Sequence, residues 1–382
     1  MPESELITDQ DRLHLRRALE LAERGRGRVS PNPLVGSVLA RAGEIIGEGH
    51  HAELGGPHAE VAAIADCRRR GADPSGATMY VTLEPCAHHG RQPPCTEAIV
   101  AAGIARVVVA SDDPSEKANG RGPGVLRDEG IAVELAEGAE AAAARRLNQA
   151  FRKHARTGRP LVVFKSALSL DGKVATAAGE SKWISGAQSR ALVHRWRADL
   201  DAVVVGVETA LADDPLLTAR DVEAPVGQAP RQPVRVVFDS QARLPIDSAL
   251  VGSIDQARLV VVAGSDAPAA RTAALQDAGA ELIVVDGTGT AQVPAALAEL
   301  GRREIASVLL EGGPTLAGSF HDAGEVDELR LFIAPIVLGG VGDRAPIEGE
   351  GATGIDEAQR ALAVDWDRIG DDLLVTARLR EW

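Results

Sequence analysis

Short apolar runs rich in β-branched residues alternate with amphipathic helical segments along most of this chain. In the first half the strand-like runs are 34–39, 44–49, 78–83 and 106–110, and the helical segments are 9–24, 58–70 and 96–102. In the second half the strand-like runs are 161–167, 202–206, 234–238, 258–263, 281–285 and 307–310, with helical segments at 185–197 and 269–278. Continuous apolar strands separated by helices indicate sheets that are covered on both faces. The chain is therefore predicted to be an α/β protein.

An Ala- and Arg-rich stretch with helical periodicity separates the two halves. It covers residues 137–156 and is followed by Gly158 and Pro160, residue types that end helices. With 382 residues the chain is long enough for two or three domains. We therefore predict one domain at 1–156 and a second at 157–382.

Charge and cysteine content exclude several classes of function. The net charge is −14, so we expect no broad nucleic-acid surface, because such surfaces need clustered Lys and Arg. Three cysteines cannot form a disulfide scaffold, and an odd number suits a reducing compartment. The chain opens with no signal-like apolar stretch and contains no apolar run long enough to span a membrane. We expect a cytoplasmic protein with neither a membrane nor a nucleic-acid partner.

Three side chains in the first half are good zinc ligands, namely His58, Cys86 and Cys95. One imidazole and two thiolates leave one tetrahedral position open for a water whose pKa the metal lowers to about 7. A structural zinc site would need a fourth protein ligand, and Cys67 lies about 13 Å beyond His58 on one predicted helix. We therefore expect Cys67 to be a buried apolar residue. A catalytic zinc site is the prediction, and a structural site or no metal is the alternative.

Glu60 follows His58 by two residues and is not needed as a ligand. It can take a proton from the zinc-bound water and pass it to a departing nitrogen, which makes it the predicted catalytic residue. The pattern H-x-E…P-C…C is typical of zinc-dependent nucleobase deaminases. Those enzymes usually have C-x-x-C, whereas eight residues separate Cys86 from Cys95 here, so the second cysteine follows a longer loop.

This longer loop resembles a known family. The segment 85–95, PCAHHGRQPPC, is similar to the PCxHxGxxPPC motif of the bifunctional riboflavin-biosynthesis deaminase/reductase. Further matches are PNPLVG at 31–36, GHH at 49–51 and YVTLEP at 80–85. The segment 113–122 matches the family only in part, since a proline is missing, so contacts from it stay open. The resemblance implies that the pyrimidine and its phosphoribosyl tail are bound by Asn32, His51, His88 and Arg91. From the residues alone, Asn32 could also be a turn residue and Arg91 a solvated charge.

A second series of motifs occupies the second half. In chain order they are KSALSLDGK at 165–173, SKWIS at 181–185, GVET at 206–209, ADDPLLT at 212–218 and EGGPTL at 311–316. Pro314 opens a predicted helix where free N–H groups favour a phosphate, although Gly-Gly-Pro is also a common connector. No G-x-G-x-x-G follows a first strand, so a Rossmann site is not predicted.

Taken in order, this series resembles the reductase domain of the same family, whose fold is similar to dihydrofolate reductase and whose cofactor is NADPH. The resemblance covers roughly residues 9–379. It implies a cytidine-deaminase-like three-layer α/β/α domain followed by a dihydrofolate-reductase-like α/β domain. The residues implied to contact NADPH are Ala167, Trp183, Thr209, Asp213, Ser240, Gly313, Pro314, Thr315, Leu316, Ala317, Gly318 and Ser319. Those implied to contact the ribose-phosphate substrate are Ser181, Arg197, Leu217, Arg220 and Glu311.

Some of these residues have simpler interpretations. Guanidinium groups can hold a phosphate with two hydrogen bonds, but Arg197 could also be an exposed helix charge. Trp183 could be a core aromatic. Lys165 and Asp171 match the motif, yet the sequence gives neither a role.

The patterns together predict a bifunctional enzyme with zinc and NADPH as cofactors. Zinc-dependent hydrolytic deamination of 2,5-diamino-6-(5-phosphoribosylamino)pyrimidin-4-one would precede NADPH-dependent reduction of the ribosyl chain to ribityl. The partner would be this small molecule, and we expect a homo-oligomer. One alternative is a nucleic-acid or free-nucleotide deaminase whose C-terminal domain only binds, and the negative charge opposes it. The other is a structural zinc protein, which the intact second series of motifs opposes.

Overall fold

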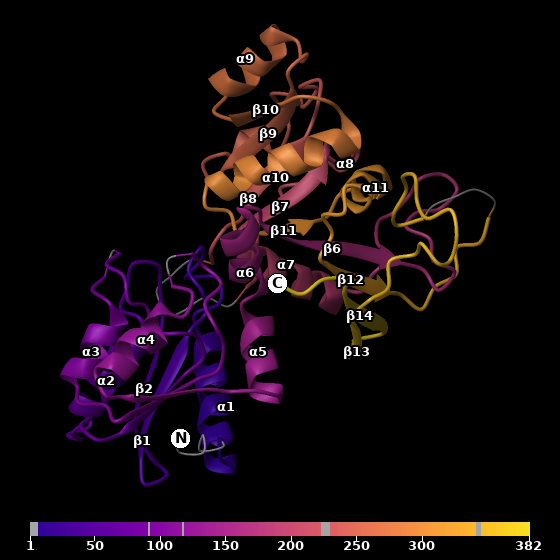
Figure 1. Ribbon diagram of the computed structural model, residues 1–382. Coiled ribbons are helices and arrows are strands. Elements are labelled where there is room, and N and C mark those ends of the chain that lie inside the picture. The colour runs from indigo at the N-terminus through magenta and orange to yellow at the C-terminus, as the bar shows by residue number, and fades with distance from the viewer. Residues whose placement is uncertain (1–6, 91, 117, 223–229, 341–344) are drawn as a thin grey trace. The chain divides into compact units, whose positions relative to one another are not determined.

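The computed structural model describes residues 7–90, 92–116, 118–222, 230–340 and 345–382. The chain divides into two compact units, Met1–Thr157 together with Trp382, and Gly158–Glu381 (Figure 1). Among the described residues, every helix is too short or too polar to cross a membrane.

A five-stranded sheet in the order β2-β1-β3-β4-β5 forms the centre of the first unit. Its strands are β1 (Gly36–Arg41), β2 (Glu44–His50), β3 (Thr78–Val81), β4 (Arg106–Val109) and β5 (Ala132–Leu135). Strand β1 runs antiparallel to β2 and β3, whereas β3, β4 and β5 are parallel. The turn between β1 and β2 uses Ala42 and Gly43 at φ of 50° and 85°, and it closes a hairpin between these two strands.

Helices cover both faces of this sheet. They are α1 (Asp9–Glu23), α2 (Ala59–Arg69), α3 (Cys95–Ala101), α4 (Arg121–Asp128), α5 (Ala139–Leu147) and α6 (Gln149–Thr157). Helices α1 and α5 pack on one face with Val38 and Val108, and α2, α3 and α4 pack on the other with Leu39 and Val107. Because successive strand residues face opposite sides, β1 and β4 contribute to both cores. The three layers predicted for this half are therefore present.

The Ala- and Arg-rich stretch is two helices, and the single predicted helix is wrong. Asn148 interrupts it by turning its side chain toward the backbone of Leu34. Its Oδ1 accepts a hydrogen bond from the Leu34 N–H at 2.8 Å, and its Nδ2 donates to the Leu34 carbonyl at 2.9 Å. The local alanine pattern cannot predict a contact with a residue so distant in the sequence.

A nine-stranded sheet in the order β10-β9-β8-β7-β11-β6-β12-β14-β13 forms the second unit. The strands are β6 (Leu161–Leu168), β7 (Ala202–Gly206), β8 (Val234–Phe238), β9 (Leu259–Gly264), β10 (Glu281–Val285), β11 (Ser307–Leu310), β12 (Glu328–Ile333), β13 (Ala363–Ile369) and β14 (Asp372–Arg378). Strands β10, β9, β8, β7, β11, β6 and β12 are parallel to one another. Strand β14 is antiparallel to both of its neighbours, β12 and β13. Strands β12, β13 and β14 were not predicted from the sequence.

The helices of the second unit are α7 (Ala187–Asp199), α8 (Val207–Asp213), α9 (Ala269–Asp277), α10 (Gln292–Arg302) and α11 (Pro314–Asp322). Helices α10 and α11 pack against the strands in a core that includes Val260, Val308 and Phe320. Strands β7, β8 and β11 end beside the starts of α8 and α11 (Figure 1). Since ligands of open α/β sheets bind outside the carboxyl ends of the strands, this edge is where a site is expected.

Candidate active sites

The three predicted zinc ligands come from three separate parts of the first unit. His58 directly precedes α2 and has an extended backbone, Cys86 lies in the segment after β3, and Cys95 is the first residue of α3. The His58 Nδ1 lies 3.2 Å from the Cys95 Sγ and 3.6 Å from the Cys86 Sγ. All three donor atoms lie within 4.8 Å of one another. The fold thus brings the predicted ligands together.

The spacing and chemistry of these donors fit a zinc ion. Zn–S bonds of about 2.3 Å and Zn–N bonds of about 2.0 Å place tetrahedral donors about 3.5–3.8 Å apart. A hydrogen bond from Cys95 and another from His58 lower the pKa of the Cys86 thiol, which favours the thiolate that binds metal. Cys67 is fully buried in the apolar core, with its Sγ 3.5 Å from the Ala72 carbonyl oxygen. It is not one of the three clustered donors.

Glu60 lies in the first turn of α2 and is 3% exposed. Its carboxyl group interacts with the Cys95 side chain. Burial, followed by the charge of Cys86, raises the pKa of Glu60 to about 7. A buried carboxyl group beside the metal donors is well placed to hold or release a proton there.

Two predicted pyrimidine-binding residues adjoin the donors. The Asn32 Nδ2 lies 3.2 Å from the His51 Nε2, and the His51 Nδ1 lies 3.0 Å from the Pro57 carbonyl oxygen. The His51 and His58 rings stand edge to face with their centres 5.4 Å apart. Asn32 is therefore more than a turn residue, because its side chain contacts a ring next to the metal donors.

The other two predicted residues belong to the loop between the cysteines. The His88 Nδ1 is buried and has no hydrogen-bond partner in the part of the chain that the structure describes. Buried polar atoms normally have a hydrogen-bond partner, so the His88 Nδ1 is available to bond with a ligand. Arg91 lies outside the described residues.

Glu84, to which the sequence patterns assigned no role, anchors Gly120 and Gly122. Its buried carboxylate accepts hydrogen bonds from the Gly120 N–H at 3.0 Å and the Gly122 N–H at 3.2 Å. A Cβ at position 122 would lie 1.9 Å from the Pro85 carbonyl oxygen, so only glycine fits this approach. Gly120 and Gly122 are thereby held against Glu84 and Pro85, which precede Cys86. A glutamate directly before Pro-Cys was the available signal.

In the second unit, Arg197 and Glu311 form a nearly buried ion pair. Arg197 lies on α7, and Glu311 directly follows β11. The Nε–Oε1 and Nη2–Oε2 distances are 2.6 and 2.9 Å, and the side chains are 13% and 9% exposed. Although burial opposes it, Arg197 and then Lys165 lower the pKa of Glu311. Arg197 is therefore not an exposed helix charge, and Lys165 is a second cation beside the same carboxylate.

Four of the five predicted reductase substrate residues belong to one network around Thr218. Leu217, the residue before Thr218, is buried and has a φ of 53°. The Thr218 carbonyl accepts a hydrogen bond from the Arg197 Nη1 at 3.3 Å, and the Thr218 Oγ1 accepts one from the Arg220 Nη1 at 3.1 Å. Ser181 is exposed, and no hydrogen bond or ion pair joins it to this network within the described residues. The residues brought together are Arg197, Leu217, Arg220 and Glu311.

Several predicted NADPH residues gather at the carboxyl edge of the sheet. Helix α11 begins at Pro314, no side chain caps it, and the Gly313 N–H donates to the Thr209 Oγ1 at 3.1 Å. The Ser240 Oγ donates to the Gln292 Oε1 at 3.1 Å, while the buried Gln292 Nε2 has no partner among the described residues. An uncapped helix start suits a phosphate, and an unpaired amide donor suits a ligand acceptor. These residues fit a dinucleotide.

The remaining predicted NADPH residues differ in exposure. Trp183 is 71% exposed, and the Arg190 guanidinium lies 4.7 Å from its ring centre, so Trp183 is not a core aromatic. Asp213 pairs with Lys182 at 2.9 Å. Ala167 lies near the end of β6.

Within α11, two predicted NADPH residues face other parts of the protein. Ala317 is buried in the apolar core. Gly318 packs against backbone, since a Cβ there would lie 2.0 Å from the Glu348 carbonyl oxygen. The residues of this segment that are accessible are Gly313, Pro314, Thr315, Leu316 and Ser319.

Asp171 and Lys173 hold the segment 338–340 next to the end of β6. The Asp171 carboxylate accepts the backbone N–H groups of Leu338 and Gly339, both at 2.9 Å, and the Lys173 Nζ donates to the Gly340 carbonyl at 2.8 Å. The N–H of Leu338, foremost among several donors, lowers the pKa of Asp171 to about 2. The motif around Asp171 therefore has a structural role that its sequence did not reveal.

Comparison with known proteins assigns the chain to a family. Residues 8–111 match the family model of the cytidine and deoxycytidylate deaminase zinc-binding region, and residues 160–375 match that of the RibD C-terminal domain. The riboflavin biosynthesis protein RibD of Actinobacillus pleuropneumoniae is 40% identical over 376 residues, which cover 98% of this chain and 97% of that protein. The chain belongs to the RibD family. RibD of Escherichia coli (strain K12) is 42% identical over 344 residues, with 86% and 89% of the two chains covered.

Solved RibD structures have the same fold. The diaminohydroxyphosphoribosylaminopyrimidine deaminase/5-amino-6-(5-phosphoribosylamino)uracil reductase of Thermotoga maritima matches with a TM-score of 0.83 at 34% identity, covering 97% of this chain and 99% of that one. RibD of Acinetobacter baumannii matches with a TM-score of 0.83 at 35% identity and the same coverage. The chain is thus a bifunctional riboflavin-biosynthesis enzyme, with zinc in its deaminase and NADPH in its reductase. The predicted fold class, enzyme class and cofactors are confirmed.

Proposed function

We propose that the first unit deaminates 2,5-diamino-6-(5-phosphoribosylamino)pyrimidin-4-one and that the second unit reduces the ribosyl chain of the resulting uracil. The observation that carries this proposal is the convergence of His58, Cys86 and Cys95 beside the buried Glu60. The two reactions are those named for the Thermotoga maritima protein, to which 97% of this chain is similar. The domain boundary that we propose, between 156 and 157, assigns one reaction to each side.

In the deamination, water adds to the amino-bearing carbon and ammonia leaves, so that a carbonyl replaces the C–NH₂ group. Zinc, when held by His58, Cys86 and Cys95, supplies the Lewis acid that activates this water. Glu60 takes a proton from the water and gives it to the leaving nitrogen. The substrate is held by Asn32, His51, His88 and Arg91.

In the reduction, the ring-opened imine of the ribosyl chain gains a hydride at C1′ and a proton at nitrogen, which yields the ribityl chain. NADPH supplies the hydride when bound at the carboxyl edge of the second sheet. The protein's task is to hold donor and acceptor carbons in contact. The ribose phosphate is held by Ser181, Arg197, Leu217, Arg220 and Glu311.

The test substitutes Glu60→Gln and measures both reactions in one preparation. Ammonia release should fall by about 10²–10⁴-fold, while bound zinc and NADPH oxidation with the deaminated product stay unchanged. Glu20→Gln is the control, because this glutamate is 66% exposed, and it should alter neither reaction. Unchanged ammonia release by the Glu60→Gln enzyme would refute the role of Glu60. Failure of the unmutated enzyme to oxidise NADPH with the deaminated product would refute the second step.

We also propose that the protein acts in the cytoplasm as a homo-oligomer. All three cysteines are free thiols, which suits a reducing compartment. The edge strand β13 exposes Val364 and Trp366, at 58% and 70%, and a second copy would cover this apolar edge. Analytical ultracentrifugation tests the assembly, and a single monomeric species at micromolar concentration would contradict it.

A further inference from the structure

Residues 216–220 of the second unit form a loop that carries two of the predicted substrate residues, Leu217 and Arg220. The loop comes shortly after α8 and contains no helix or strand. Among the described residues, none of its backbone groups forms a hydrogen bond with another backbone group. Leu217 is buried with a φ of 53°, a left-handed conformation that is unfavourable for a leucine. Contacts from outside the loop must therefore hold it in this conformation.

Gln232 supplies two of these contacts from the segment that precedes β8. Its Oε1 accepts a hydrogen bond from the Ala219 N–H, and its Nε2 donates one to the Ala219 carbonyl, both at 2.9 Å. Paired residues of two antiparallel strands exchange hydrogen bonds in the same way. The amide of Gln232 thus replaces a neighbouring strand for the middle of the loop.

Arg235, on β8, attaches the start of the loop to the protein interior. Its side chain is fully buried, and its Nη1 donates to the Leu216 carbonyl at 3.3 Å and to the Ser253 Oγ at 2.7 Å. Its Nη2 donates to the Ser253 carbonyl at 3.0 Å. Burial removes water from a guanidinium group, and these oxygen atoms replace it.

His194, on α7, contacts the end of the loop. Its Nδ1 lies 3.2 Å from the Arg220 backbone nitrogen and 3.1 Å from the Thr218 carbonyl oxygen. Without a hydrogen, Nδ1 accepts a bond from the Arg220 N–H, and with a hydrogen it donates one to the Thr218 carbonyl. His194 therefore bonds to the loop backbone in either tautomer.

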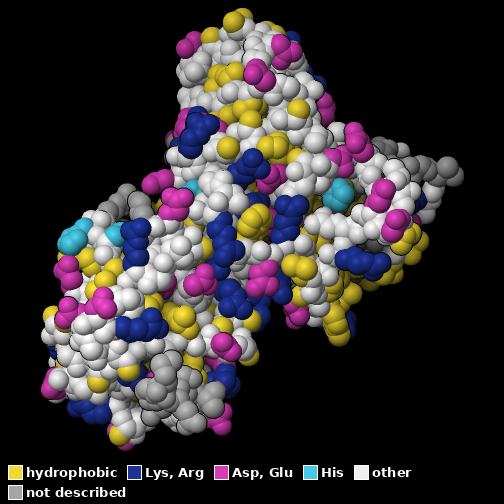
Figure 2. Space-filling model, in the orientation of Figure 1, with side chains coloured by type: hydrophobic (Ala, Val, Ile, Leu, Met, Phe, Trp, Pro, Cys, Tyr) yellow, Lys and Arg dark blue, Asp and Glu magenta, His cyan; other side chains and the backbone are white. Residues whose placement is uncertain are grey.

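The loop ends in an available cation, Arg220. This residue is exposed and forms no ion pair within the described part of the chain, and its Nη1 donates to the Thr218 Oγ1 at 3.1 Å. On the face of the second unit that Figure 2 shows, basic side chains are interspersed with acidic ones, so no broad positive surface there attracts a phosphate. Binding of a phosphate at Arg220 therefore depends on where the loop places this one guanidinium group.

We propose that Gln232 and His194 are positioning residues of the reductase, which hold the loop 216–220 so that Leu217 and Arg220 meet the ribose phosphate of the substrate. A loop that already has its binding conformation loses less conformational freedom when the ligand binds, and affinity rises accordingly. The inference rests on the proposed reductase function and adds two residues that act through the loop. Neither residue belongs to the motifs of the second half.

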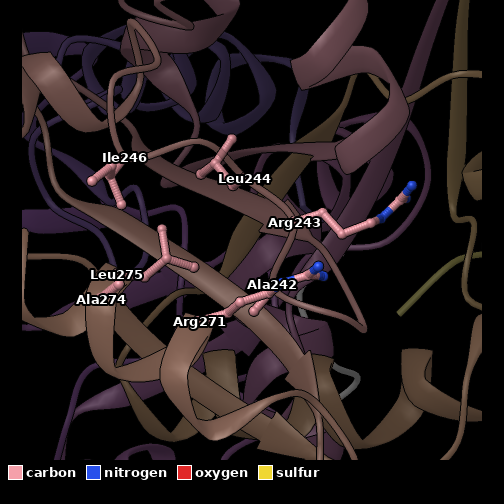
Figure 3. Close-up of a pocket in the computed structure, with 7 residues that line it drawn as sticks. All are labelled: Ala242, Arg243, Leu244, Ile246, Arg271, Ala274 and Leu275. Atoms are coloured by element: carbon pink, nitrogen blue, oxygen red, sulfur yellow. The ribbon is translucent and has the colours of Figure 1, made fainter.

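Gln232 lies at the opposite end of β8 from the predicted NADPH residue Ser240. Gln232 precedes this five-residue strand and Ser240 follows it, and such a strand spans about 16 Å. A pocket of about 410 Å³, lined in part by Arg243 and Arg271, also lies on the side after β8 and against α9 (Figure 3). A change at Gln232 should therefore alter binding of the pyrimidine substrate and leave binding of NADPH unaltered.

The test measures steady-state kinetics of the full-length protein with NADPH and the deaminated product of the first reaction. Gln232→Met keeps the length of the side chain and removes both bonds to Ala219, so KM for the pyrimidine substrate should rise about tenfold. Both kcat and KM for NADPH should stay within about twofold. Gln256→Met is the matched control, because Gln256 is exposed and its side chain forms no hydrogen bond among the described residues. It should change none of these constants.

His194 allows rescue by a conservative variant. In His194→Asn an amide group can take the place of the imidazole Nδ1 and bond to the loop, so KM for the pyrimidine substrate should stay within about twofold. His194→Phe keeps a ring without this bond, and KM should rise about fivefold. Equal KM values for the two variants would overturn the role of His194.

A double variant tests whether Gln232 acts through Arg220. Arg220→Gln removes the charge that the loop presents, so adding Gln232→Met to it should raise KM by less than about threefold. Independent residues have effects that multiply in full, and a full tenfold further rise would overturn the inference.

The remaining outcomes separate this inference from the function on which it rests. A loss of folded protein lowers kcat and leaves KM unchanged, so that result for Gln232→Met would overturn the positioning role. If the unmutated protein failed to oxidise NADPH with the deaminated product, the proposed reductase function itself would fail.

Discussion

Replacing Arg197 with methionine should destabilise the second unit, because it leaves the Glu311 carboxylate buried without its two hydrogen bonds. The Glu311 side chain is 9% exposed, and the two bonds measure 2.6 and 2.9 Å. Removing one partner of a buried ion pair costs about 3–5 kcal/mol. Lys165 remains beside Glu311 as a second cation, so we expect a loss near the lower end, about 3 kcal/mol.

The assay is urea unfolding followed by tryptophan fluorescence. Trp196 lies on the same helix as Arg197 and stacks on Phe332 with ring centres 5.4 Å apart, so it reports on the second unit. The control is Arg258→Met. Arg258 makes the same two-bond contact with Glu281, at 2.9 and 3.1 Å, but these side chains are 56% and 39% exposed. Exposed pairs contribute about 0–1 kcal/mol, so the control should lose less than about 1 kcal/mol.

The pH dependence provides a second measurement on the same pair. The pKa of Glu311 is lowered in the folded protein, although burial opposes the shift. The stability that its charge contributes is therefore present above the ordinary glutamate pKa of about 4.3 and is lost as the pH falls through the lower folded pKa. In the Arg197→Met protein this loss in acid should shrink, since protonation there removes an unpaired charge. A destabilisation no larger than that of the Arg258→Met control would refute the reasoning.

Three further predictions concern other contacts. Asp11→Asn should destabilise the first unit by about 2–4 kcal/mol, because Asp11 accepts hydrogen bonds from Tyr80 at 2.7 Å and Arg106 at 2.8 Å; an unchanged melting temperature would contradict this. Asp171→Asn should increase amide hydrogen exchange in the segment 338–340, which its carboxylate now holds, and equal exchange in the two proteins would argue against that role. Cys95→Ala should abolish zinc binding in metal analysis, whereas Cys67→Ala, in the apolar core, should retain zinc and cost about 1 kcal/mol. Loss of zinc from both variants would count against the three-ligand site.

The zinc donors were predictable because their signal is local. His58 and Glu60 are two residues apart, and each cysteine lies next to a proline that marks the same loop. The strands from β6 to β11 were predictable because each is a continuous apolar run. Strand β13 was not, since solvent reaches both of its faces and Asp365 and Trp366 are exposed alike. A strand exposed on both faces lacks the alternation of apolar and polar residues from which a half-buried strand is predicted.

Contacts between distant residues were beyond the sequence patterns. The break at Asn148 depends on the backbone of Leu34, more than a hundred residues earlier. Arg243 and Arg271 belong to none of the motifs, and only the packing of α9 against the turn after β8 places them at one pocket. Such pairings are set by tertiary structure, which local propensity does not encode.

The position of β6 between β11 and β12 in the second sheet has a consequence for how the chain is synthesised. Leu161 pairs with Ser307 on one side, and Val163 pairs with Glu328 on the other, so both neighbours of β6 are synthesised about 150 residues after it. At about 5–20 residues per second, β6 waits roughly 7–30 s for its first partner. The sheet of the first unit is already complete at Leu135. During synthesis the deaminase unit can therefore fold while β6 stays unpaired, and over this interval the apolar residues Leu161 to Phe164 lack the partner strands that bury them in the finished sheet.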